Sequence, residues 1–220
     1  MKGCSTGSAE QGERKTASMV AAEASIEEIL PEERLRAHQY QLLARFLAAP
    51  PDAALLRLAS SFTSDETELG RALGALAMLA ARVTPEAAGR EYHDLFIGVG
   101  RGELLPYASY YLTGFLHERP LAKLRVDMSR LGIARADEVK EPEDHIAALC
   151  DMMAGLITGA FGPPLDLVDQ KAFFEAHLAP WAERFFEDLE GAKSATLYTP
   201  VGTIGRVFMG IERAAFGMET

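Results

Sequence analysis

The chain has 220 residues, of which 48% are hydrophobic, and a formal net charge of −10. This hydrophobic content excludes a wholly disordered chain. The acidic balance argues against general nucleic-acid binding, which needs a cationic surface to displace counterions, and it favours a cationic partner such as a basic peptide.

Export, membrane insertion and disulfide bonding are not expected from this sequence. No segment approaches the roughly 18 uninterrupted apolar residues of a membrane span, and the first residues lack the apolar core of an export signal. Two cysteines, Cys4 and Cys150, are too few for a thiolate zinc site and an unpromising pair for a structural disulfide. We therefore expect a cytoplasmic protein.

The N-terminal part of the chain divides into a polar tail and a first helix. Residues 1–24 are small and polar, and we expect them to be a mobile tail, with a single helical domain over residues 25–220. Ser25 and Glu28 have the spacing of a capping box, and Pro31 suits a first helical turn. The predicted core positions of this helix are Leu35, Leu42 and Phe46.

Three more helices are predicted before residue 98. Asp52 and Ser64 are candidate N-caps for the second and third helices, and Thr84 followed by Pro85 marks the start of the fourth. The fourth helix places Tyr92, Leu95 and Phe96 on one face. A glycine-rich loop and an aromatic segment follow it.

The second half of the chain also has helical periodicity throughout. Pro120 begins a helix that Gly132 is placed to end, and a helix beginning near Pro142 runs to about Ala160. Three further helices carry apolar positions at helical spacing: Phe173, His177, Trp181, Phe185, Leu189, Val201, Ile204, Phe208 and Ile211. Alternating apolar and polar runs are absent, so we predict an all-α protein, a single globular bundle of about nine or ten helices.

An acidic cluster opens the helix near residue 142. Pro142 is the expected first helical residue, and acidic groups in the first turn favour the helix dipole. At 100° per residue, Asp144 should point away from the apolar stripe, onto a face with Ala148, Asp151 and Gly155. We interpret this face as an acidic lip beside a groove wall of small side chains, suited to a positively charged partner.

Other chemistry is less well supported by the residues. The segment from Gly98 to Gly102 superficially resembles a nucleotide-binding loop, but a helix precedes it and no Lys-Ser or Lys-Thr follows. His93, His145 and His177 could meet Asp94 and Asp144 in space to bind a metal, although no local spacing requires it. A metal-dependent hydrolase using His93, Asp94, Asp144 and His145 therefore stays open as an alternative, as does a nucleotide-regulated chaperone.

Three segments together resemble the TorD/DmsD/NarJ family of redox-enzyme maturation chaperones. The first, from Tyr92 to Gly98, is similar to an aromatic-x-x-Leu-Phe-x-Gly motif. The second, from Leu105 to Tyr111, is similar to a Pro-aromatic-x-Ser-x-Tyr segment. The third, from Glu141 to His145, matches an E-P-x-D-H signature, and the order and spacing of all three agree with the family.

The resemblance implies an all-helical cytoplasmic chaperone with no catalytic residue, metal or cofactor. Its partner would be the twin-arginine signal peptide, the catalytic subunit, or both, of a molybdenum-containing oxidoreductase similar to formate dehydrogenase or dimethyl sulfoxide reductase. The peptide-binding residues that the resemblance implies are Tyr92, Leu95, Phe96, Pro106, Tyr107, Glu141, Pro142, Glu143, Asp144 and His145. A monomer is expected, and a helix-swapped dimer with its hinge near residues 98–106 is the alternative.

Overall fold

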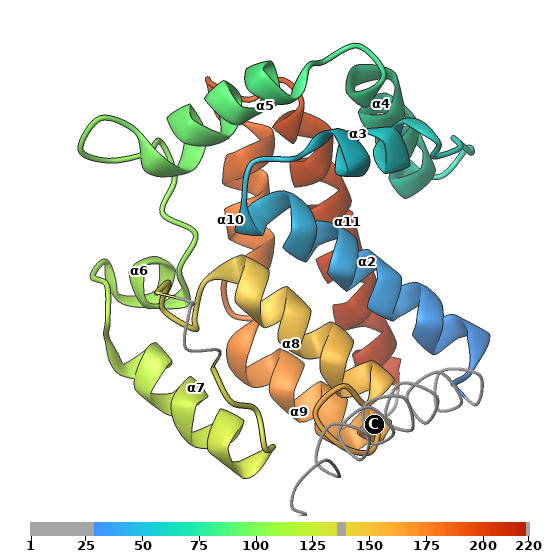
Figure 1. The fold of residues 1–220 in the computed structure, drawn as a ribbon. Helices are drawn as coiled ribbons and strands as arrows, with labels where there is room; N and C mark the ends of the chain where they lie inside the picture. The colour runs from blue at the N-terminus through green and yellow to red at the C-terminus, as the bar shows by residue number, and fades with distance from the viewer. Residues whose placement is uncertain (1–28, 136–139, 219–220) are drawn as a thin grey trace, which may run out of the picture.

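The computed structural model describes residues 29–135 and 140–218, and within these ranges the protein is all-helical (Figure 1). The helices are α2 (Pro31–Ala48), α3 (Ala53–Ser60), α4 (Glu68–Ala80), α5 (Pro85–Tyr92), the π-helical turn η1 (His93–Ile97), α6 (Ala108–Thr113), α7 (Arg119–Arg130), α8 (Ile146–Thr158), α9 (Leu167–His177), α10 (Ala182–Glu190) and α11 (Tyr198–Met218). The predicted all-α class is confirmed. Tail residues 1–24 and the capping box at Ser25 lie outside the described ranges.

The core is built by two closely packed helix pairs. Helix α8 packs along α2, and α10 packs along α11, which also contacts α4 and α2. In Figure 1 α2 crosses in front of α10 and α11 and α8 lies in front of α9, while α6 and α7 extend from one side of the bundle. Because α8 is covered on most sides, ten of its thirteen residues are buried. It is therefore the central helix of the fold.

Several predicted helix starts are confirmed. Pro31 occupies the first turn of α2. The side chain of Asp52 accepts a hydrogen bond from the Leu55 amide, and Thr84 accepts one from the Ala87 amide. Gly132 follows the end of α7 with a φ of 71°, the left-handed geometry that ends many helices. These local signals act within one turn, which is why the sequence reveals them.

Other expectations about the helices were wrong. Thr67, not Ser64, caps α4 by accepting from the Gly70 amide. Leu35 and Ile211, predicted as core positions, are 66% and 48% exposed. Helical periodicity identifies a face, but it cannot say how far along a helix the neighbouring helices extend, and within residues 29–135 and 140–218 no neighbour fully covers these two positions. The aromatic segment forms the short helix α6, which was not predicted.

The helix of the acidic cluster begins four residues later than predicted. Pro142 precedes the helix, and α8 begins at Ile146 with His145 as its N-cap. The His145 Nδ1 atom accepts a hydrogen bond from the Ala147 amide at 3.1 Å. Histidine is an uncommon N-cap residue, whereas proline is frequent in the first turn of a helix. The sequence therefore favoured a helix start at Pro142. Residues 142–145 are consequently a turn, and their side chains do not follow helical spacing.

Candidate functional site: an apolar groove beside α8

The C-terminal half of α5 continues into a π-helical turn. The Gly98 amide donates to the His93 carbonyl at 2.7 Å, the wider spacing of a π-turn. Leu95 is fully buried, while the Phe96 ring packs edge-on against Tyr92, with 5.0 Å between ring centroids. The predicted aromatic face therefore exists, but Leu95 lies behind it in the core.

Glycines after this turn are required by packing. A Cβ atom on Gly98 would lie 2.0 Å from the Arg101 carbonyl oxygen, and one on Gly102 would lie 2.4 Å from the Phe96 carbonyl carbon. The loop is tied down by Arg101, whose Nη2 donates to the Tyr110 hydroxyl at 2.7 Å. Close backbone approach thus accounts for the glycine-rich segment, and a nucleotide loop is not needed to explain it.

The second and third motifs are joined directly. The Ala108 amide donates to the Asp144 carbonyl at 3.0 Å, and the Ile146 amide donates to the Pro106 carbonyl at 2.9 Å. These bonds form an isolated antiparallel bridge between Tyr107 and His145. Two segments that are more than thirty residues apart in sequence therefore act as one structural unit.

Asp144 holds this unit together. Its side chain is 1% exposed, and Oδ2 accepts a hydrogen bond from the Ser109 amide at 2.8 Å. Ser109 lies in the first turn of α6, where free amides and the helix dipole favour a carboxylate. The expectation that Asp144 points outward as part of an acidic lip is wrong, because the residue lies before the helix and points into the protein.

Glu143 forms ion pairs with two arginines. It is 8% exposed, and its Oε2 atom accepts from the Arg125 Nη2 atom at 2.8 Å. The Arg135 Nη1 atom lies 3.6 Å from Oε1. Burial acts to raise the pKa of Glu143, but Arg125, a backbone hydrogen bond and Arg135 together hold that pKa below its usual range. Glu143 therefore anchors α7 to the turn before α8.

His145 is neutral in the folded protein. Burial lowers its pKa to about 4, against the opposing influence of Glu141 and Asp144. Its ring packs edge-on against Tyr107, with the centroids 5.1 Å apart. Burial, together with the hydroxyl's hydrogen bond to Glu141, raises the pKa of Tyr107. At physiological pH this part of the site presents uncharged rings.

A groove of about 630 Å³ runs beside α8 and brings the three motifs together. Eight of the ten predicted site residues line it; Leu95 and Asp144 do not. The lining residues are Ala44, Arg45, Ala48, Tyr92, Phe96, Ile97, Pro106, Tyr107, Met128, Ile133, Ala134, Arg135, Glu141, Pro142, Glu143, His145, Ala147, Ala148, Asp151, Met152 and Phe161. Most of this surface is apolar, and the volume is in the range of ligand-binding clefts.

Small side chains open the groove along α2 and α8. Ala44 and Ala48 lie one turn apart on α2, and Ala147 and Ala148 lie in the first turn of α8. Of the face predicted to form a groove wall, Ala148 and Asp151 line the groove, whereas Asp144 and Gly155 do not. The contribution of α2 was missed, since its alanines look like ordinary helix formers in sequence.

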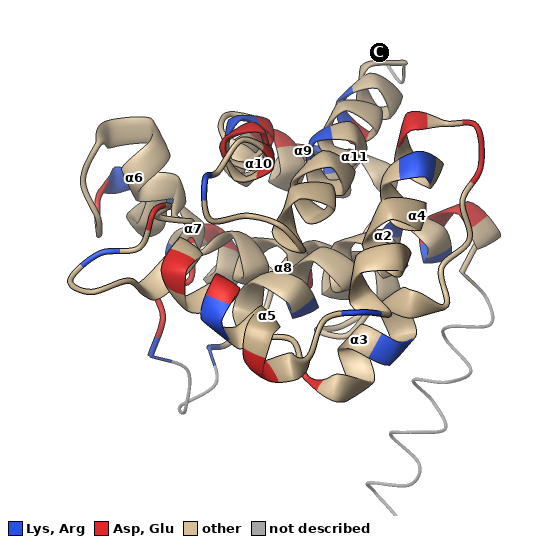
Figure 2. Ribbon diagram, turned by 90° about the horizontal axis from the view of Figure 1, so that it is seen from above, with Lys and Arg blue, Asp and Glu red and all other residues tan. Residues whose placement is uncertain are grey.

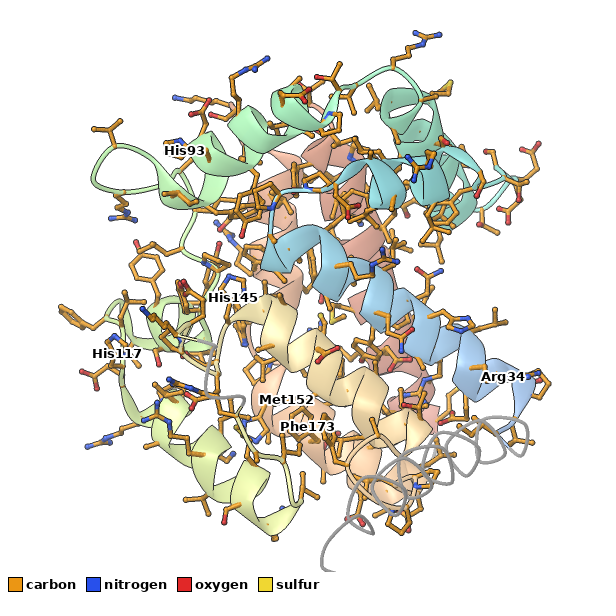
Figure 3. The ribbon with its side chains drawn as sticks, in the orientation of Figure 1. Arg34, His93, His117, His145, Met152 and Phe173 are labelled. Atoms are coloured by element: carbon orange, nitrogen blue, oxygen red, sulfur yellow. The ribbon has the colours of Figure 1, made fainter. Side chains whose placement is uncertain are left out.

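The residues of the hydrolase hypothesis do not come together. His93 and Asp94 are exposed on η1, Asp144 is buried, and His145 caps α8. Figure 3 shows His93 and His145 on separate parts of the molecule. Among the described residues, no group of three or more His, Cys, Asp or Glu side chains is arranged to hold a metal ion. The hydrolase hypothesis is therefore not supported.

The surface charge is consistent with the composition. Acidic and basic positions are dispersed over the helices in Figure 2. The ranges that the structure describes also contain no helix long and apolar enough to cross a membrane.

Comparison with curated proteins identifies relatives named chaperone protein TorD. The Photobacterium profundum protein is 37% identical over 91 residues, which cover 40% of this chain and 42% of the relative. The Vibrio cholerae protein is 30% identical over 126 residues, covering 54% and 57%. The chain thus spans about half the length of the curated relatives it matches.

Family and fold comparisons agree with these relatives. A crystal structure from Archaeoglobus fulgidus, named as a candidate redox enzyme maturation protein, has a TM-score of 0.51 at 22% identity and covers 81% of this chain and 93% of its own. The fold is therefore shared with that protein. The sequence model of the nitrate reductase delta subunit family matches residues 62–187, more than half of the chain. The protein belongs to this family, the TorD-like group that its three motifs indicated.

Proposed function

We propose that this protein is a non-catalytic assembly chaperone for a redox enzyme. It would bind the twin-arginine leader of a molybdenum-containing oxidoreductase subunit, and the cofactor-free subunit itself, until the cofactor is inserted. The candidate clients resemble formate dehydrogenase or dimethyl sulfoxide reductase. The single observation that carries the proposal is the convergence of the three motifs on one apolar groove.

The groove has the properties that an apolar peptide needs. Tyr92, Phe96 and Tyr107 supply aromatic surface, and alanines on α2 and α8 allow a peptide backbone to approach closely. An amphipathic helix in a groove is a common recognition mode, in which apolar anchors at helical spacing enter the cleft. The apolar part of a leader peptide would fit such a surface.

The ten predicted residues take two different roles in this proposal. Those that line the groove contact the peptide: Tyr92, Phe96, Pro106, Tyr107, Glu141, Pro142, Glu143 and His145. Leu95 and Asp144 support the groove from behind, Leu95 by packing in the core and Asp144 by fixing the start of α6. The two curated relatives described above are named chaperone protein TorD, which supports a chaperone role for this protein.

Calorimetric titration tests the proposal. Leader peptides from the redox-enzyme precursors of the same organism would be titrated into the protein, each beside a control peptide with Arg-Arg replaced by Ala-Ala. We expect micromolar or tighter binding of at least one leader, and at least tenfold weaker binding of its control. Absence of heat with every leader would contradict leader binding and direct attention to the mature subunit.

A further inference from the structure

The acidic residues around the groove are not equivalent. The Asp144 carboxylate is buried and accepts from the Ser109 amide, and the charge of Glu143 is paired with two arginines, so neither charge is free for a cationic group of a partner. Glu141 is exposed at the rim and accepts a hydrogen bond from the Tyr107 hydroxyl. Two carboxylates therefore remain accessible to a cation. Asp151 is one, and Glu141, which already accepts a hydrogen bond from Tyr107, is the other.

Of these four carboxylates, Asp151 is the one without a hydrogen-bond donor or a positive charge beside it among the described residues. It is exposed on α8, yet its side chain forms no hydrogen bond or ion pair with any described residue. Partial burial raises its pKa, and no positive charge opposes that shift. A carboxylate that is partly desolvated without a counter-charge would gain more than a fully hydrated one from a cationic partner.

The surroundings of Asp151 are apolar. It shares the groove wall with Ala147, Ala148 and the Phe161 ring, which packs against Gly155 one turn farther along α8. Asp151 follows the N-cap by six residues, so it lies about 9 Å along the helix from His145. Figure 3 shows His145 at the start of α8 and Met152, the neighbour of Asp151, farther along it. The residue is therefore set in the groove wall, away from the rim formed by Glu141 and Pro142.

We infer that Asp151 receives an arginine side chain of the bound peptide and that this contact selects arginine-bearing apolar segments. The inference rests on the proposed function, because it assigns the charge recognition within the same groove. A guanidinium is planar and weakly hydrated, so it can lie against Phe161 and the alanines while forming two parallel hydrogen bonds to the carboxylate. The more strongly hydrated lysine ammonium group fits this apolar wall less well.

Charge balance in the groove supports this assignment. His145 is neutral, and Arg135 already faces Glu143. Arg45 is the remaining basic side chain of the lining, on the α2 wall. Its one positive charge does not offset the two open carboxylates, so an arginine-bearing peptide would complement the groove in charge as well as in apolar surface.

A double-mutant cycle by calorimetry tests the inference. The leader peptide and its Arg→Gln and Arg→Lys versions would be titrated into the parent protein and into the Asp151→Asn variant. We expect Asp151→Asn to weaken binding of the arginine peptide by about ten- to a hundred-fold, as for a hydrogen bond to a charged group. The Arg→Gln change in the peptide should weaken its binding to the parent protein by a similar factor. The same change should have little further effect on its binding to the Asp151→Asn variant, which already lacks the partner carboxylate.

Two control variants separate charge recognition from other effects. Glu187→Gln removes one negative charge from an exposed position outside the groove and should bind like the parent. Asp151→Glu keeps the carboxylate and should retain most of the affinity and the preference for arginine over lysine. If Asp151→Asn binds every peptide as the parent does, the inference is overturned while the proposed function stands. If no peptide binds the parent, the proposed function fails, and this inference fails with it.

Discussion

Asp144 and His145 each act on the first turn of a different helix. Asp144 accepts from the Ser109 amide in α6, and His145 accepts from the Ala147 amide in α8. Two backbone hydrogen bonds complete the connection: the Pro106 carbonyl accepts from the Ile146 amide, and the Ala108 amide donates to the Asp144 carbonyl. The two polar residues of the third motif thus set the position of two groove segments, which gives them a structural role whether or not they contact a peptide.

Removal of the Asp144 side chain should therefore destabilise the fold. We expect Asp144→Ala to lower the free energy of unfolding by about 1–3 kcal/mol, because it leaves the buried Ser109 amide without its acceptor. Chemical denaturation followed by circular dichroism measures this change. Asp151→Ala, seven residues along the chain and exposed, should stay within about 0.5 kcal/mol of the parent. Equal stabilities of the two variants would contradict the capping role.

At the scale of residues, the sequence predicted which residues come together better than it predicted how their side chains are oriented. Eight of the ten proposed site residues line one groove, yet the sequence could not show that Asp144 points inward. That orientation depends on where α8 begins, and the start is set by a histidine cap that propensities disfavour. The ion pairs of Glu143 join it to Arg125 and Arg135, which a local pattern cannot reveal.

At the scale of elements, the contact between α10 and α11 shows how glycine controls helix packing. A Cβ atom on Gly202 would lie 2.5 Å from the Glu190 amide nitrogen, so the two helices can approach this closely only without a side chain there. Gly210 lies on the same helix, α11, and no atom of another described segment lies within 4 Å of its Cβ position. The two glycines offer a matched comparison.

We expect Gly202→Ala to lower the free energy of unfolding by about 1–3 kcal/mol, since α11 must move away from α10 to avoid backbone overlap. Gly210→Ala should raise it by about 0.5–1 kcal/mol, because alanine is the better helix former where space is free. Thermal and denaturant unfolding measure both changes. A stabilising effect at Gly202 would contradict the close packing of α10 and α11.

Most helices could be predicted from sequence, and the exceptions have physical reasons. Prolines at first turns, Asp and Thr caps, and a terminal glycine mark helix ends locally. The π-turn η1 and the short helix α6 carry no comparable local signal. The Tyr92 ring beside η1 packs against Tyr198 of α11, and α6 is capped by Asp144, so tertiary contacts from distant segments help to form both.

At the scale of the whole molecule, the groove is a product of assembly. Its walls come from α2, the α5–η1 segment, the turn before α8, and α8 itself. Arg36 and Glu212 join α2 to α11 through two hydrogen bonds of 2.7 Å, and Glu212 is 1% exposed. The bundle therefore holds α2 in place, and with it the alanines that open the groove beside α8.

Titration of a leader peptide into groove-filling variants tests the central claim most directly. Ala148→Trp and Ala48→Trp would place a large side chain in the groove from α8 and from α2, and Ala54→Trp would place one on the exposed surface of α3. We expect each groove variant to bind at least tenfold more weakly while its circular dichroism spectrum stays helical, and Ala54→Trp to bind like the parent. Parent-like affinity in both folded groove variants would show that the peptide binds elsewhere.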